Sequence, residues 1–139
     1  MSTTTDKPRG GLAALCVAEL VCWGLLYYSL PVAVTPISAD MGWSHTTVTA
    51  ALTVGLIVSA LMGPTVGRML DRHGPQLIMG AGTVIGVLAL GLVAIAPNLF
   101  VFFAAWILAG FAQAATLYPP AFAVITRWYG AERTKPLTT

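Results

Sequence analysis

The chain alternates long apolar stretches with short polar connections. The longest stretch, residues 77–125, contains no charged residue. As a single helix it would be roughly 74 Å long at 1.5 Å per residue, more than twice the thickness of a bilayer core. It must therefore turn, and Pro97-Asn98 is the strong helix breaker near its middle. The pattern predicts four membrane-spanning helices, at residues 12–37, 46–66, 77–96 and 99–125.

Two of these predicted helices carry further local signals. In the first, Pro31 and Pro36 predict a bend in the outer half, because proline removes a backbone hydrogen bond. In the second, Gly55, Ser59 and Gly63 recur at spacings of four. Small residues at this spacing are typical of close helix packing in membranes, and we interpret them as packing residues.

Composition supports a membrane location. Hydrophobic residues make up 57% of the 139 residues and charged residues 9%, whereas a soluble domain has about 25% charged residues. The first apolar stretch is also longer than the core of a signal peptide, so it is better interpreted as a span. We predict an all-α integral membrane protein surrounded by the lipid bilayer.

The sequence shows no constellation typical of catalysis, metal binding or nucleotide binding. His45 and His73 stand singly in different connections, and Cys16 and Cys22 lie on different faces of the first predicted helix. There is no phosphate-binding Gly-Lys-Ser/Thr and no basic patch for nucleic acid. We therefore predict no enzyme, no cofactor, no metal ion and no nucleic-acid partner.

The positive charges predict the orientation. They fall only in the two tails and in the connection at the middle of the chain: Lys7, Arg9, Arg68, Arg72, Arg127, Arg133 and Lys135. Cytoplasmic connections carry an excess of lysine and arginine. Residues 1–11, 67–76 and 126–139 are therefore predicted to be cytoplasmic segments of a multi-pass protein of the plasma or inner membrane.

The central connection has a distinctive pattern of charge and glycine. Gly67 allows a neighbouring helix to approach closely, and Gly74 can adopt the positive φ of a turn. Asp71 lies where a helix ends, and an anion there opposes the helix dipole. It needs a compensating partner, which Arg72, Arg68 or the N-terminus of another helix would supply. We expect residues 67–74 to form a tight polar hairpin.

The pattern Gly-x-x-x-Asp-Arg-x-Gly resembles the signature loop of the major facilitator superfamily of secondary transporters. The resemblance implies a carrier of about twelve helices, in which these four form part of the N-terminal six-helix half. Further helices would then follow residue 139. It also implies that Asp71 latches one of two access states, in a signature loop that includes Gly67, Arg72 and Gly74.

Other motifs resemble the monocarboxylate and oxalate/formate branch of that superfamily. Pro75 follows the second glycine of the loop, where the family often places basic residues. Three further motifs resemble the same branch: Gly42-Trp43-Ser44, Tyr118-Pro119, and Trp128-Tyr129 followed by Arg133. The branch implies a small organic anion such as a monocarboxylate as the substrate. The predicted spans contain no lysine or arginine to bind it, so that cation would have to come from other helices.

Glu19 is the one acidic residue within a predicted span. A carboxyl group inside the membrane is a functional candidate by default, and away from water it could bind and release a proton near neutral pH. Glu19 is therefore our candidate for coupling proton movement to substrate movement. Two structural alternatives stay open: the side chain could extend to the cytoplasmic surface, or it could pair with a cation such as Arg127.

Polar side chains of the first and fourth helices are candidates for a cavity wall. Tyr27 follows Glu19 by two helical turns and shares its face, while Gln113 and Thr116 lie on one side of the fourth helix. The resemblance implies that these two helices line a central cavity. We expect Tyr27, Gln113 and Thr116, together with Glu19, to line it, with helix packing as the structural alternative.

The leading hypothesis is a fragment of a secondary active transporter that moves a small solute by alternating access. A second hypothesis is a complete four-helix, proton-coupled exporter that acts as a dimer and is similar to the small multidrug resistance family, with Glu19 as the first-helix glutamate. A third is a non-transporting membrane scaffold or regulatory protein, which would tolerate replacement of Glu19 and Asp71.

Overall fold

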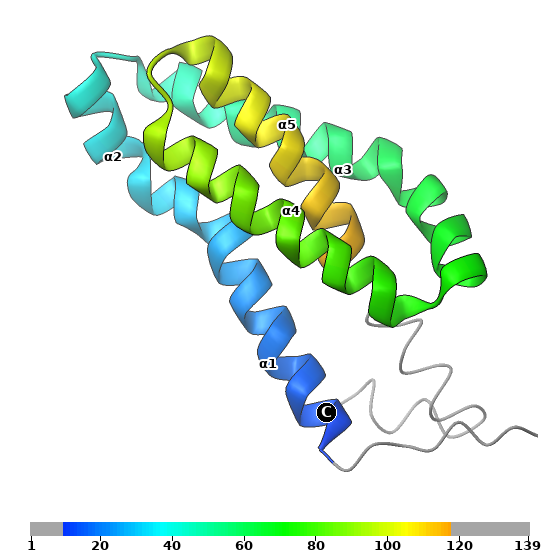
Figure 1. Cartoon of the computed structure of the whole chain (residues 1–139). Coiled ribbons are helices and arrows are strands. Elements are labelled where there is room, and N and C mark those ends of the chain that lie inside the picture. Colours follow the sequence, from blue (N-terminus) through cyan, green and yellow to red (C-terminus); the bar gives the residue numbers. More distant parts are fainter. Residues whose placement is uncertain (1–9, 118–139) are drawn as a thin grey trace, which may run out of the picture.

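The computed structural model describes residues 10–117, which fold into helices (Figure 1). They are α1 (Gly11–Trp23), the π-helical turn η1 (Gly24–Tyr28), α2 (Ser29–Met41), α3 (His45–His73), α4 (Pro75–Ile95) and α5 (Leu99–Thr116). The first three join into one helical run, Gly11–Met41. Within residues 10–117, four helices are long and apolar enough to cross a bilayer, which confirms the predicted all-α membrane fold. Residues 1–9 and 118–139 lie outside the described residues, and with them most of the predicted tail 1–11, the end of the predicted helix 99–125 and the whole predicted segment 126–139.

Local sequence sets the helix boundaries. The side chains of Ser44 and Asn98 accept hydrogen bonds from the backbone N–H groups of Thr47 (3.1 Å) and Val101 (3.0 Å). Both residues therefore cap the helices that follow them. Gly74 has a φ of 83°, the positive φ that was predicted for the turn and that glycine adopts without steric cost.

The predicted polar hairpin is wrong in its extent. α3 continues to His73, and Gly74 alone separates it from α4. The helix continues through Gly67 because one glycine destabilises a helix by only about 1 kcal/mol. Its hydrogen bonding extends to the end, where the Gly74 N–H donates to the Leu70 carbonyl at 2.9 Å. Asp71 therefore lies on the last turn of the helix rather than in a loop.

The irregular part of the first helical run lies earlier than the prolines predict. The helix widens at η1, whereas Pro36 lies inside the regular helix α2. Pro31 follows η1, and in a regular α-helix its ring would collide with the carbonyl of Tyr27, four residues earlier. A widened turn relieves that contact. Such single π turns occur frequently at functional sites, and this one carries Tyr27.

α5 is the most buried of the described helices and packs against both α3 and α4 (Figure 1). Glycines bring these helices close together. A Cβ added to Gly110 of α5 would lie 2.4 Å from the Gly55 carbonyl oxygen of α3, and one added to Gly82 of α4 would lie 2.6 Å from the Ala115 Cβ. Gly55 is thus a packing residue, as predicted, because backbone atoms of α5 occupy the space that a side chain at this position would need.

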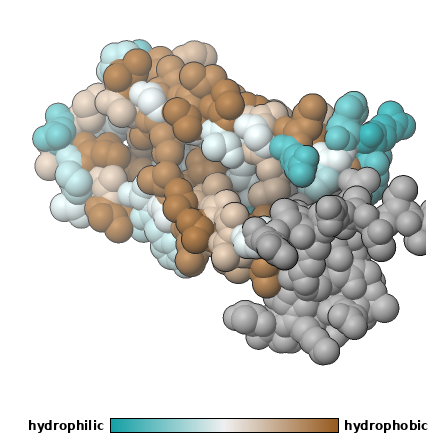
Figure 2. All heavy atoms as spheres, turned by 60° about the horizontal axis from the view of Figure 1, so that its bottom comes forward, coloured by the Kyte–Doolittle hydropathy of each residue, from teal (hydrophilic) through white to brown (hydrophobic). Residues whose placement is uncertain are grey.

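The surface has the polarity of a membrane protein. Figure 2 shows hydrophobic side chains over the middle of the visible face and hydrophilic ones gathered at its two ends. Large apolar side chains point outward from the helices, among them Leu20 (74% exposed), Val32 (81%) and Phe100 (84%). A surface this apolar is suited to lipid or to further helices, since soluble monomers rarely expose large apolar patches.

Candidate functional site

A pocket of about 270 Å³ lies between the first helical run, α3 and α5. Two of the four predicted cavity residues line it, Tyr27 from η1 and Gln113 from α5. The other lining residues are Trp23, Leu56, Ser59, Ala60, Gly63, Ala114 and Leu117. The pocket therefore brings together residues from opposite ends of the described chain.

Gln113 is the buried polar residue of this pocket. Its side chain is 1% exposed, and its Nε2 donates a hydrogen bond of 2.7 Å to the backbone carbonyl of Leu26 in η1. In a π turn the donor to that carbonyl would be the N–H five residues later, but residue 31 is proline and has none. Gln113 thus supplies a donor from α5 to the distorted turn.

The other end of the same amide, Oε1, has no hydrogen-bond partner in the part of the chain that the structure describes. Among the described residues, nothing donates a hydrogen bond to Oε1 of Gln113, although this atom is buried. Buried polar side-chain atoms are usually paired in folded proteins, so an exception requires an explanation. The unpaired oxygen belongs to a residue that lines the pocket.

Aromatic rings form a second wall of the pocket. The ring centroids of Trp23 and Tyr27 are 5.1 Å apart at an interplanar angle of 63°, an edge-to-face arrangement that aromatic pairs prefer. The ring centroid of Tyr28 is 5.0 Å from that of Tyr27, but Tyr28 is 58% exposed and does not line the pocket. The widened turn thus directs Tyr27 inward and leaves Tyr28 outside.

Thr116, another of the four predicted cavity residues, is not among those that line this pocket. Its hydroxyl donates to the Ala112 carbonyl of its own helix at 2.8 Å, and its Cγ2 would lie 2.8 Å from a Cβ added to Gly82. Three residues along a helix correspond to about 300°, so Thr116 is rotated by about 60° from Gln113. That rotation turns Thr116 towards α4.

The α3 wall contains residues that sequence reasoning assigned elsewhere. Ser59 and Gly63 line the pocket, although their spacing indicated helix packing. A Cβ added to Gly63 would meet nothing within 4 Å, whereas one added to Gly55 would lie 2.8 Å from the Trp106 carbonyl oxygen. Small residues mark the face of α3 that turns towards α5, but they do not reveal where the two helices touch and where a space remains.

Glu19 lies one turn before Trp23 on α1 and outside the pocket lining. Both of its carboxyl oxygens are buried, and neither accepts a hydrogen bond from the described residues. The side chain therefore does not extend to the surface in this structure. Its other structural alternative, a pair with Arg127, lies outside the described residues. A buried carboxyl group that has no donor among the described residues remains a functional candidate.

The signature residues lie at the exposed end of α3. Asp71 and Arg72 are exposed, and the Arg68 guanidinium donates to the Thr65 hydroxyl of its own helix at 3.4 Å. No atom lies within 4 Å of a Cβ added to Gly67, so none of the described helices makes the close approach predicted there. The partner of Asp71 stays a prediction about parts of the carrier outside residues 10–117.

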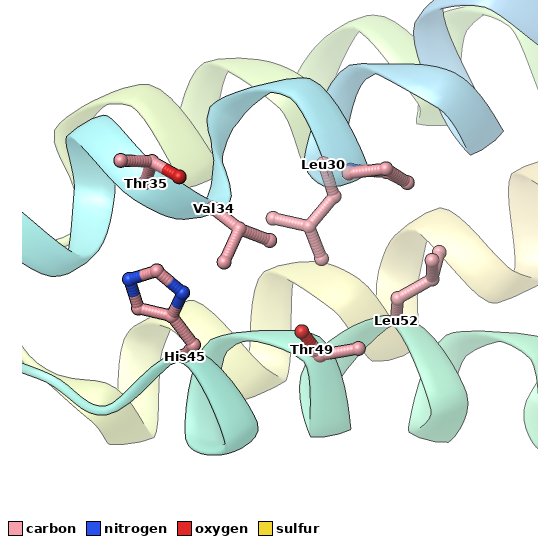
Figure 3. A pocket seen from close by; sticks show the side chains of 7 residues that line it. Leu30, Val34, Thr35, His45, Thr49 and Leu52 are labelled. Atoms are coloured by element: carbon pink, nitrogen blue, oxygen red, sulfur yellow. The ribbon is translucent and has the colours of Figure 1, made fainter.

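A second pocket, of about 370 Å³, lies between α2 and α3 and was not predicted from sequence. In Figure 3 the His45 ring points from the start of α3 towards Thr35 and Val34 of α2. The residues that line this second pocket are Leu30, Pro31, Val34, Thr35, His45, Thr49 and Leu52. No spacing in the sequence links Thr35 to His45, because only the packing of α2 against α3 brings them together.

Comparison with known proteins identifies the family. A family model described as Major Facilitator Superfamily matches residues 15–138. This range includes Glu19, the glycine and charge pattern around Asp71, and the pocket of about 270 Å³ that Gln113 lines, called the Gln113 pocket below. The chain belongs to the major facilitator superfamily. Members of this superfamily are transporters rather than enzymes. The predicted superfamily is thus confirmed, while the monocarboxylate branch stays a prediction.

One curated relative is similar along most of this major facilitator chain. It is an "MFS-type transporter" of Gibberella moniliformis (strain M3125 / FGSC 7600), 26% identical over 129 residues. The matched region is 93% of this chain but 31% of the relative, so the chain spans about a third of the length of that protein. No solved structure matches the chain.

Proposed function

We propose that this chain forms part of a secondary active transporter that moves a small solute across a membrane by alternating access. The observation that carries the proposal is the pocket in which Tyr27 of the first helical run meets Gln113 of α5. A largely apolar wall with a few placed polar groups is typical of small-molecule sites. At about 270 Å³ the pocket is smaller than the roughly 300–1,000 Å³ of drug-sized sites, which favours a small solute.

We assign proton coupling to Glu19. A coupled carrier requires the group that holds the proton to respond to the solute. Glu19 and Trp23 are four residues apart on α1 and so are neighbours on one helix face, and Trp23 lines the pocket. A solute that moves Trp23 would therefore change the surroundings of the buried Glu19 carboxyl group directly.

Asp71 is proposed as the latch of one access state, together with Gly67, Arg72 and Gly74. A carboxylate on the last turn of α3 is disfavoured by the helix dipole. The N-terminus of another helix, placed against the open face at Gly67, would stabilise it. Formation and loss of this contact would separate the two states. By the positive-inside rule this end of α3 faces the cytoplasm.

The substrate suggested by the branch resemblance is a monocarboxylate. Within residues 10–117, no lysine or arginine lines the pocket. The basic residues of that range, Arg68 and Arg72, lie at the far end of α3. A carboxylate substrate would thus require a cation from another part of the carrier.

The test uses the complete carrier reconstituted in proteoliposomes with an imposed proton gradient. Uptake is measured for a radiolabelled monocarboxylate, a polyol, a neutral amide and a small amine. We expect the gradient to drive accumulation of at least one of them. Glu19→Gln should abolish accumulation but preserve solute exchange without a gradient, because exchange needs alternation without net proton transfer. Asp40→Asn, which removes an exposed carboxylate at the end of α2, is the matched control and should preserve both.

The outcomes separate the hypotheses. Accumulation by Glu19→Gln at the wild-type level would refute proton coupling through this residue. Absence of both accumulation and exchange for every solute in the wild-type carrier would count against transport and favour a scaffold or regulatory role.

A further inference from the structure

The orientation of the Gln113 amide is determined by its partner. A side-chain amide has a donor end and an acceptor end, whereas a backbone carbonyl can only accept. The 2.7 Å contact with the Leu26 carbonyl must therefore be made by Nε2. This contact turns Oε1 away from Leu26, so the amide presents an acceptor to its surroundings.

That acceptor has no donor among residues 10–117. Oε1 is buried, its side chain is 1% exposed, and none of the described residues donates to it. A buried acceptor gains most from a partner that brings a donor, because leaving it unpaired carries the full cost of its desolvation. Since Gln113 lines the pocket, a solute that enters there is in a position to provide this donor.

The lack of a positively charged side chain among the described lining residues also favours a solute that brings a hydrogen-bond donor. A carboxylate carries only acceptors and would face the partial negative charge of Oε1. No lysine or arginine among the described lining residues would compensate it. An N–H or O–H group has the required polarity, and the rings of Trp23 and Tyr27 offer flat faces beside it. Aromatic faces also attract cationic nitrogen.

We propose that this pocket selects solutes that place an N–H or O–H donor on Oε1 of Gln113 and a flat apolar group against Trp23 and Tyr27, and that it discriminates against carboxylates. Because Oε1 is covered in this structure, the donor reaches it when neighbouring lining side chains move aside on binding. This selectivity rests on the proposed transport function, since it names the class of solute that the carrier accepts.

The test measures protection of a single cysteine in the pocket. Ser59 is replaced by cysteine in a form of the complete carrier from which every native cysteine has been removed, Cys16→Ala and Cys22→Ala among them. The rate of reaction with N-ethylmaleimide is then measured with benzamide, benzamidinium or benzoate present. These three probes have nearly the same shape and differ in their donors and charge. Benzamide and benzamidinium should slow the reaction at concentrations at least about tenfold lower than benzoate.

Two further measurements isolate the hydrogen bond. N,N-dimethylbenzamide keeps the amide carbonyl but has no N–H group, so it should protect no better than benzoate. Gln113→Leu should reduce protection by benzamide to the level of benzoate, whereas Gln76→Leu, at the start of α4 and outside the pocket lining, should not. If Gln113→Leu fails to fold, the N,N-dimethylbenzamide result in the unmodified pocket decides.

The outcomes are distinct from those of the transport test, because labelling reports binding and requires no transport. Equal protection by benzamide and benzamidinium supports a neutral donor as sufficient, and stronger protection by benzamidinium supports a cationic donor. Protection by benzoate equal to that by benzamide, or protection by none of the probes, would overturn the proposed selectivity. A carrier that binds benzamide but accumulates no solute would refute the coupling mechanism and leave the selectivity in place.

Discussion

Replacement of Gly110 by alanine should force α3 and α5 apart. The added Cβ would lie 2.4 Å from the Gly55 carbonyl oxygen and 2.9 Å from the Val58 Cβ, whereas ordinary contacts begin at 3.4 Å. The Gly55 contact is therefore too short by 1.0 Å (3.4 − 2.4). Because the atom concerned belongs to the backbone, no change of rotamer relieves the overlap, and the two helices must separate.

The expected cost follows from a matched control. Overpacking a close-packed interior costs about 1–3 kcal/mol, while alanine gains about 1 kcal/mol over glycine in helix propensity. Gly91→Ala on α4 has the same propensity gain, and nothing lies within 4 Å of its added Cβ. The difference between the two variants thus isolates the overpacking term, so Gly110→Ala should be less stable than Gly91→Ala by about 1–3 kcal/mol.

The assay is thermal unfolding of the complete carrier in detergent, followed by loss of helical circular dichroism. We expect Gly110→Ala to unfold at a lower temperature than the wild type, and Gly91→Ala at the same or a higher temperature. Equal midpoints for the two variants would refute the close contact between α3 and α5 on which the shape of the Gln113 pocket depends.

Two further predictions concern the latch and a helix boundary. Ser59→Cys reacts with a membrane-impermeant thiol reagent added to one or the other side of the membrane, and the ratio of the two rates reports the access state. Asp71→Asn should change this ratio by several fold, because the latched state loses its anion. Arg68→Gln should change the ratio less. An unchanged sidedness would contradict the latch. Asn98→Ala should lower the stability by about 0.5–2 kcal/mol, since the Val101 N–H loses its acceptor. An unaltered unfolding curve would show that this cap contributes nothing.

The sequence by itself determined the number and type of the spans. Long apolar stretches in a membrane must form helices, because only a helix satisfies all backbone groups of a single segment without water. The positive φ of Gly74 was equally predictable, because the conformation of a short turn depends on the residues next to it in the sequence and glycine adopts a positive φ without steric cost. The extent of the hairpin was not, because the charged residues near Asp71 suit an exposed helix end as well as they suit a loop.

Only the tertiary structure decided which residues form the site. Gln113 bonds a carbonyl 87 positions earlier in the chain, Thr116 turns towards α4, and Ser59 lines a pocket although it shares the spacing of the packing residue Gly55. Helical periodicity fixes the direction of each side chain relative to its own axis. Helical periodicity does not determine the position and rotation of the neighbouring helix. These depend on the sizes of the side chains that pack together at contacts such as the one at Gly110.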